Sequence, residues 1–148
     1  MDSSIKLGKV LGIPIRLHFT WFIIFALVTV SLSLGYFPET YPQWSKTLSW
    51  IIGISTSLLF FASVIAHELS HSIISARNGI PVKSITLFIF GGVARISREA
   101  DKAGSEFKMA IAGPLCSLLI GVFFGLIWLL TNQNNQTLAI NLTELLLF

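Results

Sequence analysis

The sequence predicts an all-α polytopic membrane protein with three transmembrane helices, the start of a fourth, and a small β-hairpin on the cytoplasmic side. Of the 148 residues, 53% are apolar and only 11% are charged, whereas a soluble domain carries about 25% charged residues. The charges are also absent from three long stretches, each with the roughly 20 residues that a helix needs to cross a bilayer. These observations exclude a soluble globular enzyme and a disordered chain. We therefore expect one membrane-embedded unit over residues 1–148.

The spans are predicted in order along the chain. The first, at 17–37, contains no Lys, Arg, Asp or Glu, and its apolar run is longer than the roughly 7–15 residues of a signal peptide's apolar region. The second and third are predicted at 48–76 and 107–131. The polar segment TNQNNQT is then expected to form a turn, and 138–148 to begin a fourth span, since its 11 residues are too few to complete one.

The basic residues predict the orientation. Nine of the ten Lys and Arg residues lie before the first span, between the second and third, or at the start of the third, and only Lys46 lies between the first two spans. The positive-inside rule places the basic side in the cytoplasm, so we expect a cytoplasmic N-terminus. Because the topology accounts for the net charge of +3, we expect no nucleic-acid partner.

The segment between the second and third spans predicts the hairpin. Gly79-Ile80-Pro81 is a turn signal, and VKSITLFIF, rich in β-branched and aromatic residues, is followed by Gly91-Gly92 and VARIS. The N-terminal IKLGKVLGIPIRLH has similar strand character and repeats the pattern Gly-Ile-Pro-apolar-basic. The two segments either share one small sheet at the cytoplasmic face or are two unrelated turns.

Ionisable side chains lie within an apolar run only in the second span, in the sequence HELSH, at His67, Glu68 and His71. Histidines four residues apart lie about 40° apart around a helix, so both imidazoles can bind one metal ion. Glu68 is turned about 100° from His67 and can act as a general base toward a water on the metal. His-Glu-x-x-His is a signature of zinc metalloproteases. A charged group at membrane depth costs about 2.5–3.5 kcal/mol, which favours a functional group over a structural Glu-His pair.

With two further segments, NGIPVKSITLFIFGGVARI and AGPLCS, HELSH makes the sequence resemble the site-2 protease family of intramembrane zinc metalloproteases. The resemblance implies one Zn²⁺ bound by His67 and His71, catalysis by Glu68, and transmembrane or membrane-anchored proteins as substrates. It also implies that Gly91-Gly92 lie near the cleft, in a membrane-associated hairpin to which substrate adds as an extended strand.

Two features depart from the family pattern. Many members have an asparagine three residues after the Gly-Pro proline, where this chain has Ser117. The family takes its third metal ligand from an aspartate in a later membrane helix, but this chain has only Asp2 and Asp101, so we expect that ligand beyond Phe148. His18 is expected at the membrane interface rather than on the metal.

The leading hypothesis is an intramembrane zinc metalloendopeptidase that cleaves membrane proteins with metal-activated water, in the lipid bilayer of a prokaryotic plasma membrane. The alternative is a non-catalytic or truncated homologue that acts as a membrane binding or interaction protein. A transporter with a Glu-His proton relay leaves the spacing of the two histidines unexplained. No feature of the sequence indicates an oligomeric state.

Overall fold

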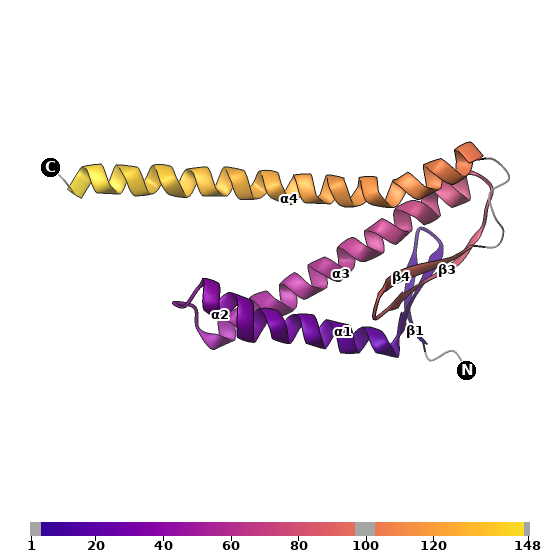
Figure 1. The fold of residues 1–148 in the computed structure, drawn as a ribbon, viewed down its shortest axis with the longest axis horizontal. Helices are drawn as coiled ribbons and strands as arrows, with labels where there is room; N and C mark the ends of the chain where they lie inside the picture. The colour runs from indigo at the N-terminus through magenta and orange to yellow at the C-terminus, as the bar shows by residue number, and fades with distance from the viewer. Residues whose placement is uncertain (1–3, 97–102, 147–148) are drawn as a thin grey trace.

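The computed structural model of the chain describes residues 4–96 and 103–146 (Figure 1). The predictions that concern Asp2 and Asp101 therefore lie outside the described residues. The helical elements are α1 (Phe19–Val30), its continuation as the π-helix η1 (Ser31–Tyr36), α2 (Phe37–Thr40), α3 (Lys46–Arg77) and α4 (Ala103–Leu146). The strands are β1 (Ser4–Val10), β2 (Ile13–His18), β3 (Val82–Phe88) and β4 (Gly91–Ile96).

Three long apolar helices are confirmed. The helical stretches Phe19–Thr40, Lys46–Arg77 and Ala103–Thr131 are each long and apolar enough to cross a membrane. Figure 1 shows α1 leading away from the sheet, α3 returning to it and α4 leading away again. The sheet thus lies beside the end of α3 that carries HELSH.

The all-α class is wrong in one respect, because the predicted hairpin is part of a four-stranded sheet with the order β1-β2-β3-β4. Strands β3 and β4 are antiparallel, as a hairpin requires, and β1 and β2 form a second hairpin. The two hairpins join through β2 and β3, which pair in parallel with Ile15 opposite Ile85 and Leu17 opposite Leu87. A lone two-stranded hairpin is marginally stable, and this pairing covers one edge of each. The two segments thus share one sheet, with Ile13-Pro14 at the start of β2 and Gly79-Ile80-Pro81 directly before β3.

A small apolar core fastens this sheet to the helices. Leu17 of β2 and Leu87 of β3 pack with Trp21 of α1 and Phe61 of α3. Ile85, in the middle of β3, is fully buried, with 0% of its surface exposed. Because Phe61 lies less than two turns before His67, the core holds the sheet against the stretch of α3 that carries the histidines.

Small residues, most of them with a hydroxyl group, form the contact between the first helical segment and α3. Ser49, Gly53 and Ser57 of α3 are spaced four residues apart and are buried, as are Thr29 of α1 and Ser33 of η1. The Thr29 hydroxyl donates to Ser57 Oγ at 2.9 Å, and Ser57 Oγ donates to the Gly53 carbonyl at 2.9 Å. Small residues at four-residue spacing let membrane helices approach closely, so this stripe sets the packing of the two spans.

Replacing Gly53 with leucine is expected to lower the free energy of unfolding by about 1–3 kcal/mol, the usual effect of overpacking. A Cβ at this position would collide with Ser33 Oγ and lie 3.4 Å from the Ser33 backbone nitrogen. Thermal unfolding in detergent, followed by circular dichroism, measures the effect. The control is Gly121→Leu, because a Cβ at Gly121 meets no atom within 4 Å. Equal melting temperatures for the two variants would contradict the packing role of Gly53.

Helix α4 differs from the prediction for the end of the chain. The segment TNQNNQT was expected to be a turn, but α4 continues through it to Leu146. The segment contains neither glycine nor proline, so its residues carry only small helix penalties. The described part of the predicted fourth segment, 138–148, therefore belongs to α4. The helix does contain Pro114, whose missing N–H bends a helix, and Figure 1 shows α4 changing direction near its crossing with α3.

Candidate metal centre

The two histidines of HELSH point at each other on one face of α3. Their Nε2 atoms are 3.2 Å apart, and the ring planes are inclined at 75°. Two nitrogens that each lie about 2.0–2.1 Å from a tetrahedral zinc ion are separated by roughly 3.3 Å. His67 and His71 therefore already have the separation that one shared metal ion requires.

Helix α4 contacts the outer nitrogen of each ring. His71 Nδ1 lies 2.5 Å from the carbonyl oxygen of Met109, and His67 Nδ1 lies 2.8 Å from Ser117 Oγ. A carbonyl oxygen only accepts hydrogen bonds, so His71 Nδ1 carries the ring proton and donates it. The neutral His71 ring then has a free electron pair on Nε2, which is the tautomer that binds a metal ion.

Gly113 lies between these two contacts on the same face of α4. It is buried, and a Cβ built on it would collide with Nε2 of both histidines. The space beside the paired nitrogens is therefore open because residue 113 has no side chain. The site residues predicted from the sequence did not include Gly113, although the AGPLCS segment that contains it was a signal that could have identified it.

Glu68 borders two cavities that lie along α3. A cavity of about 290 Å³ is lined by Glu68 and His71 together with Gly92, and another of about 340 Å³ by Glu68 and His67 together with Gly92. The carboxylate is thus next to both histidines and faces space that a peptide or water can enter. A group so placed can exchange a proton with a reactant held there.

The two glycines of the hairpin have different roles in the fold. Gly91 follows the turn at Ile89 and Phe90 and has φ +125°, a conformation that favours glycine. Gly92 lies against Glu68, because a Cβ on it would collide with the Glu68 side chain and lie 3.0 Å from its Cδ. Both glycines also line the 340 Å³ cavity. The structure therefore brings the predicted Gly91-Gly92 pair to the same site as HELSH.

Within the part of the chain that the structure describes, no group of three His, Cys, Asp or Glu residues is placed to hold a metal ion. No third side chain of these types there joins His67 and His71 in such a group. His18, the remaining histidine, caps the start of α1: its Nδ1 is 2.9 Å from Thr20 Oγ1, and its ring lies 5.0 Å from the ring of Phe88. These contacts of His18 are thus with α1 and β3. The donor set present fits two of the three protein ligands of a catalytic zinc.

Comparisons with known proteins identify what this chain is similar to. The sequence model of peptidase family M50 matches residues 55–145. The chain is 47% identical over 126 residues to a protein of Synechocystis sp. that is named as a candidate zinc metalloprotease. It is 38% identical over 122 residues to a zinc metalloprotease of Methanocaldococcus jannaschii. A solved structure, the site-2 protease from Methanocaldococcus jannaschii, matches with a TM-score of 0.61 and 35% identity.

These matches cover most of the length of this chain but half or less of the length of each relative. The alignments with the Synechocystis and Methanocaldococcus proteins cover 85% and 82% of this chain and 32% of each relative. The solved structure is matched over 84% of this chain and 50% of that chain. The chain thus spans about a third of the length of the curated relatives it matches.

Proposed function

The chain belongs to peptidase family M50, and from this membership we propose that it carries the metal-binding core of a zinc metalloendopeptidase that cleaves transmembrane or membrane-anchored proteins. The observation that carries the proposal is the 3.2 Å separation of the His67 and His71 Nε2 atoms, with Glu68 beside both rings. A structural Glu-His pair has no need for a second histidine whose Nε2 faces the first at the spacing of two ligands of one zinc ion.

His67 and His71 would hold one Zn²⁺, with the third ligand supplied from outside the described residues. When bound, zinc polarises the scissile carbonyl and lowers the pKa of water. Glu68 takes a proton from the attacking water on one of its carboxylate oxygens and delivers that proton to the leaving amine. Gly92 lies against the Glu68 side chain from β4, where a side chain in place of the glycine hydrogen would collide with it.

The substrate would lie along β4, and the glycines support this. Strand β4 is at the edge of the described sheet, and its residues Gly92, Val93 and Ala94 line the cavity that contains Glu68 and His71. An extended peptide can add to such an edge through main-chain hydrogen bonds. Peptide cleavage needs a substrate that is not helical at the scissile bond. Gly91 and Gly92 are therefore proposed to let the substrate lie extended along β4, next to Glu68.

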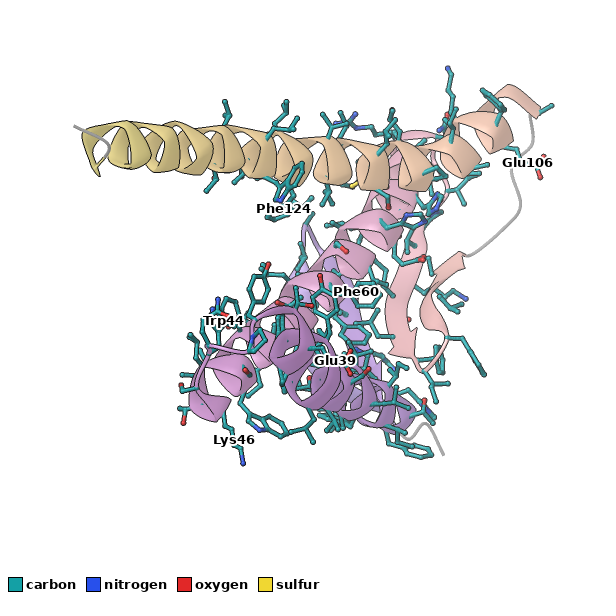
Figure 2. All side chains as sticks on the ribbon, turned by 60° about the vertical axis from the view of Figure 1, so that its left-hand side comes forward. Glu39, Trp44, Lys46, Phe60, Glu106 and Phe124 are labelled. Carbon is teal, nitrogen blue, oxygen red and sulfur yellow. The ribbon has the colours of Figure 1, made fainter. Side chains whose placement is uncertain are left out.

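The chain is proposed to span a prokaryotic plasma membrane with its N-terminus in the cytoplasm. The three long apolar helices support the membrane location. The distribution of charge supports the orientation: Lys6, Lys9, Arg16 and Lys83 lie in the strands. Lys46 is the first residue of α3, at the end of that helix away from the sheet (Figures 1 and 2). Substrates would then be membrane proteins, and no nucleic-acid partner is proposed.

The test is the zinc content of the purified protein at its full natural length. We expect one zinc ion per chain in the wild type and none in His67→Ala, because the remaining imidazole cannot form the paired site. His18→Ala is the matched control, since it removes a histidine that caps α1, and it should keep its zinc. If His67→Ala binds as much zinc as the wild type, the proposed ligands are wrong; a zinc-binding protein that cleaves nothing would instead be the non-catalytic homologue.

A further inference from the structure

Ser117 is the residue of this site whose role no sequence pattern assigns. Its hydroxyl lies 2.8 Å from Nδ1 of His67, although the two residues are 50 positions apart in the chain. The contact crosses from α4 to α3 and reaches the side of the imidazole that faces away from His71. We infer that Ser117 is a positioning residue, whose hydroxyl holds the His67 ring with Nε2 directed at the metal position.

The chemistry of the hydroxyl fits this role. A neutral histidine that binds a metal through Nε2 carries its proton on Nδ1. Ser117 Oγ has lone pairs that can accept that proton's hydrogen bond. The Nδ1–H of His67 then donates to Ser117 Oγ, as the Nδ1–H of His71 donates to the Met109 carbonyl. Each ring is thereby held by one hydrogen bond from its outer nitrogen, and the inner nitrogens face each other.

The position of Ser117 on α4 supports its role, because it lies on the helix face that contacts both histidines. Met109, Gly113 and Ser117 follow one another at four-residue intervals, so they lie on one face of the helix. The first supplies the acceptor for His71, the second leaves open space beside both Nε2 atoms, and the third contacts His67. The support for His71 comes from the backbone and survives any substitution of residue 109. The support for His67 comes from a side chain, so it can be removed by mutation.

Without the hydroxyl, His67 has more freedom to turn. Its ring is half-buried and borders the 340 Å³ cavity, whose other lining residues include Phe60 and Ser63. A rotation of the ring about the bond to Cβ would exchange the direction of its nitrogens. We therefore expect the removal of Ser117 Oγ to weaken metal binding without loosening the fold.

The experiment compares zinc affinity in the wild type, Ser117→Ala and Ser117→Asn. Loss of a hydrogen-bond partner of a metal ligand typically lowers metal affinity by about 10–100-fold, and this is the loss expected for Ser117→Ala. Ser117→Asn restores an acceptor oxygen and should recover most of the affinity. Ser105→Ala is the matched control, because it removes a hydroxyl from the same helix that contacts Asn78 instead of a histidine. Its zinc affinity should equal that of the wild type.

A spectroscopic readout separates positioning from packing. Cobalt(II) replaces zinc, and its visible absorption bands report the ligand geometry; these bands should change in Ser117→Ala and return in Ser117→Asn, while the melting temperature of the metal-free protein stays the same. Unchanged zinc affinity and cobalt bands in Ser117→Ala would overturn the inference. So would a loss of affinity that follows a lowered melting temperature and is not rescued by asparagine. The inference rests on the proposed function, whose own failure is distinguishable because the wild type would then bind no zinc.

Discussion

Replacing Glu68 with glutamine is expected to reduce proteolysis by about 10²–10⁴-fold, the usual contribution of a general acid–base group, while zinc stays bound. The substitution keeps the size of the side chain and its contact with Gly92 but removes the carboxylate that accepts a proton. Zinc binding should persist because His67 and His71 are unchanged. The measurement is cleavage of a membrane-protein substrate by the protein at its full natural length, with zinc content determined on the same sample.

The control for this variant is Glu106→Gln, which makes the same chemical change at an exposed residue. Glu106 lies in the first turn of α4, and Figure 2 shows it away from the crossing of α3 and α4. This variant should cleave at the wild-type rate. Full activity of Glu68→Gln would rule out Glu68 as the proton-transfer group, even if the two histidines bind zinc.

Replacing Gly113 with alanine is expected to lower zinc affinity by more than the roughly 10–100-fold typical of a lost hydrogen-bond partner. The added methyl group would collide with Nε2 of both His67 and His71, so it blocks the space that the ion needs or forces the rings apart. Either outcome destroys the 3.2 Å pairing of the two nitrogens. Zinc affinity of the purified variant measures the effect.

Gly113→Ala should not unfold the protein, so a loss of zinc affinity would report on the metal site and not on the fold. Alanine is favoured over glycine inside a helix by roughly 1 kcal/mol, so α4 itself should form at least as readily. Gly121→Ala is the matched control on this helix, because a Cβ there meets nothing within 4 Å. If Gly113→Ala binds zinc as tightly as Gly121→Ala, the ion does not occupy the space beside Gly113.

The amino-acid sequence by itself determined the three apolar helices and the His67, Glu68 and His71 cluster. Both depend on local regularities: a helix of about 20 apolar residues suits a bilayer, and a four-residue spacing puts two side chains on one helix face. The hairpin at 82–96 was predictable for the same reason. Its turn and strand signals are contiguous in the chain.

Only the tertiary structure decided what surrounds that cluster. The Met109 carbonyl and Ser117 Oγ lie 38 and 50 residues along the chain from the histidines they contact, and their contacts depend on how α4 crosses α3. The parallel pairing of β2 with β3 is also non-local, and it turned a predicted hairpin into a four-stranded sheet. Spacing along one helix is set by its pitch, but the depth at which two helices meet is set by the smallest residue between them. Here that residue is Gly113, and although its AGPLCS segment could be singled out in the sequence, only the crossing of α3 and α4 shows that two imidazoles lie against it.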